Sequence, residues 1–209
     1  MQDMVGHNSH VWDVCQQGPN INTCKNTTFL QNACHKFPIL TSKIVRLRLS
    51  LTRALLDDPT LEDMKIIYLV RDPRGTMNSR LGSVKWCSDS DDCINPARLC
   101  DDIDNDLDAF ENMSELYPSR LALIKYETLA AQPKKTFQAI FNFAGLLFPK
   151  EIEENIVKHT SRNDEKPWST IRKSTERISL WKTKLDKGKL QEIQGVCTKV
   201  LSRLGLALV

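Results

Sequence analysis

The clearest signal along the chain is a short apolar run without polar alternation at residues 66–70 (IIYLV). A run of this kind is typical of a parallel strand that is buried on both faces. The polarity then changes within one residue, because Arg71 follows the run, Asp72 can cap a helix and Pro73 suits the first helical position. The pattern predicts a strand, a sharp turn and a helix, with Arg71 at the carboxyl edge of the sheet.

Similar apolar runs predict two further strands, at residues 41–47 (TSKIVRL) and residues 121–126 (LALIKY). Apolar side chains that recur every three or four positions predict amphipathic helices around these strands. The helices are expected at residues 49–56, 97–116 and 133–144. Gly145 suits the C-terminal end of the last one. The alternation of strands and helices predicts an α/β fold with a parallel sheet and crossover helices.

The last third of the chain is predicted to be helical, at residues 150–159, 175–185 and 187–204. A polar, basic loop that contains Pro167 separates the first two of these helices. The loop gathers aromatic, hydroxyl and cationic side chains that suit a nucleotide phosphate, namely Trp168, Ser169, Thr170, Arg172, Lys173 and Ser174. The alternative is a basic connector without a ligand, since loops are normally polar and exposed.

Composition and charge favour a single globular domain with one basic end. The chain has 209 residues, of which 41% are hydrophobic and 26% charged, as is ordinary for one α/β domain. The net charge of +3 conceals an asymmetry: residues 89–111 carry nine acidic side chains against Arg98 alone, whereas residues 158–203 carry twelve basic side chains against five acidic ones. The basic end suits an anionic cofactor or glycan, and a solvated surface is the alternative. We expect no nucleic-acid partner.

Arg71 is the first candidate for ligand binding. Open α/β folds bind ligands at the carboxyl edge of the sheet, and a helix N-terminus there favours an anion, so a phosphate is the expected ligand. Ser79 lies about 9 Å up the helix from Pro73 at 1.5 Å per residue, so it can share a phosphate with Arg71 only along the helix flank. The alternative is an arginine that only pairs with a nearby carboxylate.

The segment LVRDPRGTMNSR at residues 69–80 resembles the 3′-phosphate-binding segment of sulfotransferases that use 3′-phosphoadenosine 5′-phosphosulfate (PAPS). It resembles in particular the Golgi carbohydrate 6-O-sulfotransferases that act on GlcNAc, galactose or GalNAc. The resemblance implies that Arg71 and Ser79 bind the 3′-phosphate of PAPS. We also expect Arg74, the second arginine of the RDPR motif, among the cofactor-binding residues.

Other segments are similar to the same family in the same order, so the similarity is expected to run from around Cys24 to the C-terminus. They are TSKIVRL, LIKYETL, FNFAGL and WSTIRKSTERISLWK, the last of which looks like the family's STxK…W segment. In that segment Arg172 stands where the family has lysine, and Lys173 stands where it usually has asparagine. The resemblance implies that Arg172 binds PAPS, and we include Lys173 beside it.

Cysteine usage favours an oxidising compartment, because seven cysteines are many for a reduced cytosolic enzyme of this size. Cys87, Cys93 and Cys100 cluster in one loop, so we expect at least one disulfide to join that loop to itself or to its surroundings. The odd count leaves at least one thiol free or intermolecular, and the pairing stays open. Zinc is disfavoured by the lack of a close Cys-x-x-Cys pair and of a histidine at ligand spacing. Asn26 and Asn112 are glycosylation acceptors if the chain is luminal.

The resemblance also implies a location and an incomplete domain. The sequence has no apolar run of the roughly 18 to 20 residues that a membrane span needs. Members of the resembled family look like type II membrane proteins. The resemblance therefore implies that the parent protein has an N-terminal anchor and a catalytic domain in the Golgi lumen. The family's first strand and its loop for the 5′-phosphosulfate have no counterpart here. We therefore expect residues 1–209 to be one partial domain, with a Cys-containing segment (1–40), a strand and helix core (41–145) and a helical part (146–209).

The implied activity is transfer of the sulfuryl group of PAPS to a sugar hydroxyl of a glycan or glycosaminoglycan, expected to be the 6-OH of GlcNAc, galactose or GalNAc, without a metal. The acceptor hydroxyl needs a general base. The family's base is expected upstream of this chain, so we nominate no catalytic residue and expect the chain to be inactive alone. The alternative is a non-catalytic glycan-binding or regulatory fragment of the same fold. A P-loop nucleotide kinase is disfavoured, because no G-x-x-x-x-G-K-[ST] loop is present.

Overall fold

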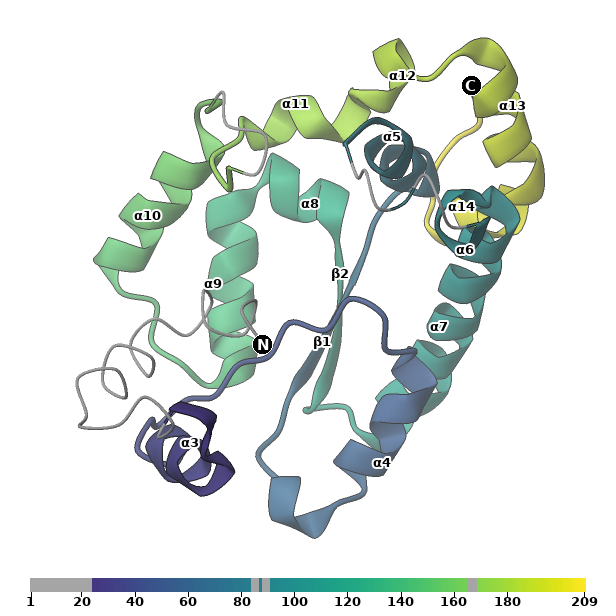
Figure 1. Cartoon of the computed structure of the whole chain (residues 1–209). Helices are drawn as coiled ribbons and strands as arrows, with labels where there is room; N and C mark the ends of the chain where they lie inside the picture. The colour runs from purple at the N-terminus through teal and green to yellow at the C-terminus, as the bar shows by residue number, and fades with distance from the viewer. Residues whose placement is uncertain (1–23, 84–86, 88–90, 165–168) are drawn as a thin grey trace. The chain divides into compact units, whose positions relative to one another are not determined.

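The computed structural model describes residues 24–83, 87, 91–164 and 169–209 (Figure 1). The chain divides into two compact units, residues 1–46 and residues 47–209. In the first unit the structure describes the helix α3 (Thr27–Cys34), which is capped by Asn26. The Asn26 side chain accepts a hydrogen bond from the Phe29 amide at 3.1 Å. The finer division at residues 40 and 145 stays a prediction.

The sheet in the described part of the second unit pairs β1 (Ile66–Val70) with β2 (Leu121–Lys125) in parallel. Two predicted strands are thereby confirmed, and the second ends one residue earlier than expected. The register sets Val70 opposite Lys125, so the residues that follow the two strands start from the same edge of the sheet. The fold is the predicted α/β arrangement with a parallel sheet and crossover helices.

The turn after β1 follows the predicted chemistry. Asp72 is buried, and its carboxylate accepts a hydrogen bond from the Arg74 amide at 2.9 Å, which caps α5 (Pro73–Ser83). Pro73 occupies the first helical position, where a missing N–H costs no hydrogen bond. The predicted unit of strand, turn and helix is therefore confirmed.

The remaining described elements of the second unit are helical. They are the 3₁₀ helices η2 (Leu49–Thr52) and η3 (Pro59–Leu61) and the α-helices α4 (Arg53–Leu56), α6 (Asp91–Ile94), α7 (Pro96–Leu116), α8 (Tyr126–Ala131), α9 (Pro133–Ala144), α10 (Lys150–Thr160), α11 (Ser174–Ser179), α12 (Trp181–Lys184), α13 (Lys187–Val196) and α14 (Thr198–Arg203). Each predicted helix is present, although two long ones are split at Leu180 and Cys197. As expected, α9 ends at Gly145, whose φ of 74° is left-handed.

The main core lies between β1 and the helices α5, α7, α13 and α14. Its buried side chains are Val70, Met77, Leu99, Cys100, Ile103, Leu107, Ile193, Cys197, Val200, Leu201 and Leu204. Because side chains alternate along a strand, this core covers one face of β1. Ile67 and Leu69 point to the other face and are 40% and 52% exposed. The predicted burial of β1 on both faces is therefore wrong.

The strand predicted at residues 41–47 is also wrong. These residues form no strand, and Ile44 and Val45 are 63% and 74% exposed. A strand persists only where a neighbouring strand shares its backbone hydrogen bonds, and the sheet in the described part of the chain contains β1 and β2 only. High β-propensity without such a neighbour leaves this segment irregular.

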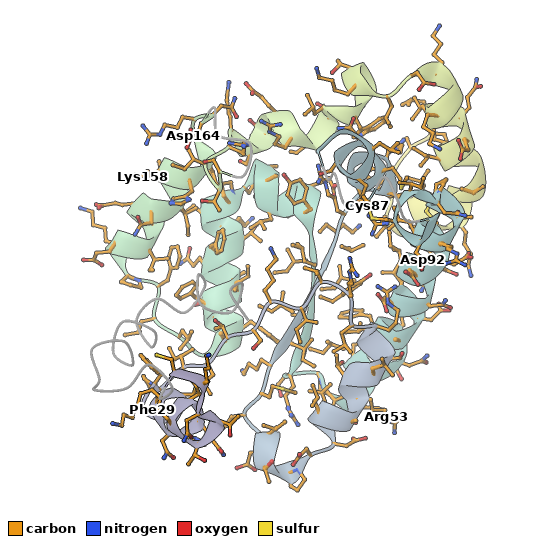
Figure 2. The ribbon with its side chains drawn as sticks, in the orientation of Figure 1. Phe29, Arg53, Cys87, Asp92, Lys158 and Asp164 are labelled. Atoms are coloured by element: carbon orange, nitrogen blue, oxygen red, sulfur yellow. A yellow bond between two sulfur atoms is a disulfide. The ribbon has the colours of Figure 1, made fainter. Side chains whose placement is uncertain are left out.

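Two disulfides in the second unit confirm the prediction for the cysteine cluster. Cys87, which is labelled in Figure 2, pairs with Cys93. Cys100 pairs with Cys197, 97 residues away in the sequence. The second bond joins α7 to the residue that follows α13, inside the main core. The cluster is therefore covalently tied both to itself and to its surroundings.

Other features of the described residues bear on metals, membranes and thiols. No group of three or more His, Cys, Asp or Glu side chains among them could hold a metal ion. None of their helices is long and apolar enough to cross a membrane.

In the first unit Cys24 is disulfide-bonded, whereas Cys34 is an exposed free thiol. A free thiol agrees with the odd number of cysteines.

Candidate functional site

Arg71 stands at the carboxyl end of β1 with its side chain half-buried. Its guanidinium group lies over the ring of Tyr126, 4.4 Å from the ring centroid, which is within cation–π range. Nη2 of Arg71 donates a long hydrogen bond of 3.5 Å to the carbonyl oxygen of Arg177. Gly75 leaves room for this arrangement, because a Cβ atom there would come within 3.2 Å of Nε of Arg71.

The charge of Arg71 is available to an anion. Among the described residues, no carboxylate forms an ion pair with Arg71. The carboxylate that follows it, Asp72, is instead committed to Arg74 at 2.9 Å. The sequence alone leaves open that Arg71 only pairs with a neighbouring carboxylate. Among the described residues it has no such partner.

Arg74 makes structural contacts on all sides, and its expected part in cofactor binding stays a prediction. Its side chain is 3% exposed, and Nε and Nη2 donate to the Asp72 carboxylate at distances of 2.9 to 3.2 Å. Nη1 donates to Oε1 of Gln194 at 3.1 Å and to the carbonyl oxygen of Ala207 at 2.8 Å. The ring of Trp181 covers the guanidinium group, 4.2 Å away. In this structure the Arg74 cation is therefore enclosed by protein groups.

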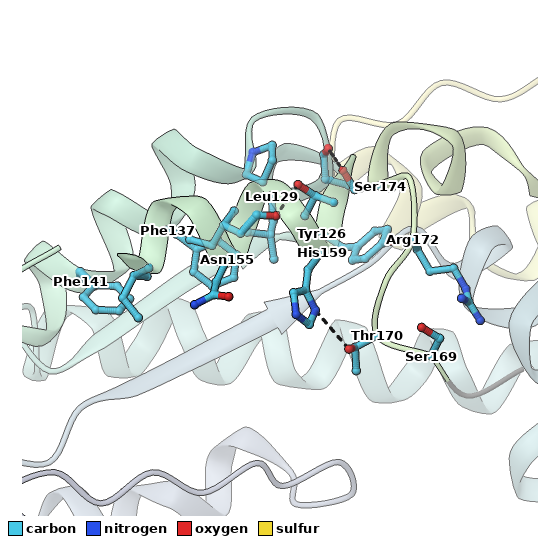
Figure 3. Close-up of a pocket in the computed structure, with 15 residues that line it drawn as sticks. Tyr126, Leu129, Phe137, Phe141, Asn155, His159, Ser169, Thr170, Arg172 and Ser174 are labelled. Atoms are coloured by element: carbon cyan, nitrogen blue, oxygen red, sulfur yellow. Dashed lines mark hydrogen bonds between the residues drawn. The ribbon is translucent and has the colours of Figure 1, made fainter. Parts of the chain in front are cut away.

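A cavity of about 670 Å³ opens beside Tyr126, between α8, α9, α10 and the residues before α11 (Figure 3). Its volume is typical of small-molecule sites. The apolar walls include Leu129, Phe137, Phe141 and Ile156. The polar side chains are Tyr126, Asn155, His159, Thr160, Ser169, Thr170, Arg172 and Ser174. Figure 3 shows the phenylalanines at one end and Arg172 with Ser169 and Thr170 at the other.

The predicted phosphate-binding loop contributes Arg172 to this cavity. Nη1 of Arg172 donates to the carbonyl oxygens of Asp164 at 2.8 Å and Ile171 at 2.9 Å. Its backbone N–H donates to the carbonyl oxygen of His159 at 2.9 Å, while the His159 ring pairs with the Thr170 hydroxyl at 3.2 Å. These bonds hold the end of the loop against α10.

The other loop residues have different positions. Lys173 is exposed, is not among the cavity-lining residues, and pairs with Glu176 at 2.8 Å, a hydrogen bond that raises the pKa of Lys173. Ser174 lines the cavity, and its hydroxyl donates to the carbonyl oxygen of Ala130 at 2.8 Å. Trp168 lies outside the described residues. The structure thus brings Arg172 and Ser174 to the cavity and leaves Lys173 outside it.

Ser79 is half-buried on α5, and its hydroxyl makes no hydrogen bond within the described part of the chain. Neither Ser79 nor Arg71 lines the cavity, so Tyr126 is the residue that connects Arg71 to it. Binding of one phosphate by Arg71 and Ser79 together stays a prediction.

Tyr126 and two phenylalanines of α9 are site residues that sequence reasoning missed. The helical spacing of Phe137 and Phe141 predicts core positions, but both line the cavity. A signal for Tyr126 was present, because it follows β2 just as Arg71 follows β1. Residues that follow neighbouring parallel strands meet at one edge of the sheet, where ligands bind.

The chain is similar in sequence to a known domain family and to two carbohydrate sulfotransferases. The family model described as "Sulfotransferase domain" matches residues 1–205, so the similarity starts earlier than the expected Cys24. Carbohydrate sulfotransferase 1 of Danio rerio is 27% identical over 210 residues, which cover 91% of this chain and 50% of that protein. Carbohydrate sulfotransferase 3 of Mus musculus is 26% identical over 200 residues, which cover 88% of this chain and 42% of that protein. The chain thus spans about half the length of the curated relatives it matches. No solved structure is significantly similar.

Proposed function

Because the chain belongs to the sulfotransferase domain family, we propose that it forms the nucleotide-binding part of a PAPS-dependent carbohydrate sulfotransferase. The proposed reaction transfers the sulfuryl group of PAPS to a sugar hydroxyl, the 6-OH of GlcNAc, galactose or GalNAc. The names of two similar proteins, carbohydrate sulfotransferases 1 and 3, support a carbohydrate acceptor.

The observation that carries the proposal is the pair of Arg71 and Tyr126 at the carboxyl edge of the sheet. Arg71 offers guanidinium donors without a carboxylate partner among the described residues, and the N-terminus of α5 adds a favourable dipole. Guanidinium groups bind phosphate with strong, charge-assisted hydrogen bonds. We therefore assign the 3′-phosphate of PAPS to Arg71, with the Ser79 hydroxyl as a second donor.

The cavity beside Tyr126 is the proposed site of the adenosine. Its aromatic and apolar walls suit the faces of a base, and Arg172 and Ser174 supply polar groups at the Tyr126 end. Tyr126 lines the cavity and also lies under Arg71. A nucleoside in the cavity can therefore direct its 3′-phosphate toward Arg71.

The protein's work in such a reaction is mainly to hold and orient the donor. The acceptor oxygen attacks sulfur in line, the bond between sulfur and the 5′-phosphate oxygen of PAPS breaks, and the hydroxyl proton passes to a general base. We assign nucleotide binding to the residues described above and assign no residue of this chain as the base.

We propose that the 209-residue chain alone binds nucleotide without transferring sulfate, because its sequence shows no recognisable loop for the 5′-phosphosulfate. Loss of a single oxyanion donor typically slows an enzyme about a hundredfold to a thousandfold. The test is incubation of the purified chain with radiolabelled PAPS and GlcNAc- or galactose-terminated acceptors. Turnover comparable to that of a full-length carbohydrate sulfotransferase would contradict this part of the proposal.

The disulfides support an oxidising, secretory compartment, where such bonds persist. We propose the Golgi lumen, with a glycan or glycosaminoglycan as acceptor. A non-catalytic glycan-binding role is the second candidate, and it is favoured if the chain binds acceptor glycans but not the product nucleotide, 3′-phosphoadenosine 5′-phosphate (PAP).

Calorimetric titration with PAP tests the proposed nucleotide site. Arg71→Ala should weaken PAP binding by about 1.5 to 3 kcal/mol, as expected for the loss of a hydrogen bond to a charged group. Arg53→Ala is the matched control, because Arg53 is an exposed arginine on α4 whose described ion pair is with Asp57. It should leave the affinity unchanged. Equal PAP affinity of the wild-type chain and Arg71→Ala would remove Arg71 from the site.

A further inference from the structure

The end of α14 turns the chain back toward α13. Gly205 has a φ of 70°, the left-handed conformation that reverses a helix end. Its N–H donates to the carbonyl oxygen of Ser202 at 2.9 Å, and the Leu206 N–H donates to the carbonyl oxygen of Leu201 at 2.8 Å. Residues 206–209, the tail, therefore leave α14 in a fixed direction.

Gln194 of α13 fastens the tail. Gln194 is buried, with 8% of the residue exposed. Nε2 of Gln194 donates to the carbonyl oxygen of Val209 at 2.8 Å, and Oε1 accepts the Val209 N–H at 2.9 Å. The same Oε1 accepts Nη1 of Arg74 at 3.1 Å, and Nη1 also donates to the carbonyl oxygen of Ala207 at 2.8 Å. One buried amide thus joins the tail to α5.

Arg74 transmits this contact to the turn that holds Arg71. The Asp72 carboxylate binds Nε and Nη2 of Arg74 and also caps α5 through the Arg74 amide. The Asp72 backbone N–H donates to Oε1 of Glu127 on α8 at 3.0 Å. Asp72 directly follows Arg71, so these bonds fix the backbone from which the Arg71 side chain leaves.

A second contact reaches the other member of the stack. Lys125, the last residue of β2, donates from Nζ to the carbonyl oxygen of Leu204 at 2.7 Å. Lys125 directly precedes Tyr126. The chain from Leu204 to Val209 therefore contacts the end of β2 directly and, through Arg74, the turn that follows β1.

We propose that the tail, held by Gln194 and acting through Arg74, positions Arg71 over Tyr126 for nucleotide binding. Gln194 is then a positioning residue that contacts no nucleotide itself. The effect on affinity rests on the proposed function, whereas the effect on the turn at residues 71–76 does not. The two parts can therefore be tested separately.

The experiment compares the wild-type chain with Gln194→Ala, Gln194→Glu and the exposed neighbour control Gln191→Ala, all on α13. Amide hydrogen exchange should rise at residues 71–76 in Gln194→Ala and stay unchanged in Gln191→Ala. The PAP affinity of Gln194→Ala should fall about tenfold, the scale of one lost hydrogen bond to a charged group. Gln194→Glu keeps an acceptor for Arg74 but replaces the Nε2 donor that holds the carbonyl oxygen of Val209 by an oxygen, so it should lose affinity as Gln194→Ala does. A chain that lacks residues 207–209 should behave like Gln194→Ala.

The outcomes separate the two claims. A merely structural role would raise exchange throughout β1 and α7. Full PAP affinity in Gln194→Glu would show that the contact with Arg74 suffices without the hold on Val209, and would contradict the inference. Unchanged exchange at residues 71–76 in both Gln194→Ala and the shortened chain would overturn the inference. If the wild-type chain does not bind PAP, the proposed function fails, and the exchange data still decide whether the tail positions the turn.

Discussion

The guanidinium group of Arg71 and the ring of Tyr126 are stacked with 4.4 Å between the guanidinium carbon and the ring centroid, at the ends of two paired parallel strands. Because Tyr126 also lines the cavity, its ring should matter more for nucleotide binding than its hydroxyl. Tyr126→Ala should weaken PAP binding by about 0.5 to 2 kcal/mol, the usual range of a cation–π contact. Tyr126→Phe should bind PAP almost as well as the wild-type chain. Calorimetry that finds equal losses in the two variants would assign the effect to the hydroxyl instead.

Asp104 and Asp106 of α7 lie two residues apart and should respond to pH in opposite directions. Asp104 accepts hydrogen bonds from Lys199 at 2.6 Å and Arg203 at 2.7 Å, and these bonds lower its pKa. Asp106 is 4% exposed, and burial raises its pKa although it accepts the Leu49 amide at 2.8 Å. An aspartate in the unfolded chain titrates near pH 3.9, about the ordinary value.

The signs follow from proton linkage. A carboxyl group whose pKa is lower in the folded chain than in the unfolded chain stabilises the fold at pH values above its unfolded pKa. This contribution is lost as the pH falls through its folded pKa. A carboxyl group whose pKa is higher in the folded chain stabilises the fold at pH values below its unfolded pKa. This contribution is lost as the pH rises through its folded pKa. Asp104→Asn should therefore lower stability at neutral pH and reduce the loss on acidification. Asp106→Asn should remove a decline in stability that begins as the pH rises above about 4.

Urea denaturation at a series of pH values between about 3.5 and 7 measures both effects. Asp101→Asn is the matched control, because Asp101 is an exposed aspartate of the same helix. It should leave the pH profile unchanged. A change of the same sign in Asp104→Asn and Asp106→Asn would show that one of the two pKa directions is wrong.

The bond between Cys100 and Cys197 should be the more stabilising of the two disulfides in the second unit, because it closes a sequence separation of 97 residues against 6 for Cys87 and Cys93. Replacing Cys100 and Cys197 together by alanine should lower the free energy of unfolding by about 2 to 5 kcal/mol. Cys34→Ser should not change it, since that thiol is free and exposed.

Peptide mapping of secreted protein under non-reducing conditions checks the pairing itself. The expected cross-linked peptides contain Cys87 with Cys93 and Cys100 with Cys197. Free thiols at Cys87, Cys93 and Cys100 would contradict the pairing and the proposed oxidising compartment, where cysteines this close to a partner should oxidise.

Local signals predicted those parts of the fold that depend on a few neighbouring residues. Asp72 and Pro73 start a helix by capping chemistry that needs only adjacent residues, and Gly145 ends one by its left-handed conformation. Residues 41–47 failed as a strand because a strand depends on a partner that its own residues do not specify. The burial of β1 failed for a similar reason, since the residues of a strand do not specify whether another element packs on its second face, and Ile67 and Leu69 are exposed there.

The same distinction between local and distant contacts applies to the residues of the site. Arg71 could be predicted because its position follows from one strand and one turn. The role of Arg74 could not, because its acceptors Gln194 and Ala207 lie 120 and 133 residues away in the sequence. The RDPR motif therefore contains one arginine that we assign to the ligand and one that is enclosed by the fold.

The most direct test of the central claim, that Arg71 binds the 3′-phosphate, compares PAP with 5′-AMP, which lacks that phosphate. Both nucleotides are titrated into the wild-type chain and into Arg71→Ala. The wild-type chain should prefer PAP roughly 10- to 100-fold, the scale of a hydrogen bond to a charged group, and Arg71→Ala should lose most of that preference while its affinity for 5′-AMP stays the same. An equal loss of affinity for PAP and 5′-AMP in Arg71→Ala would contradict the assignment of the 3′-phosphate to Arg71.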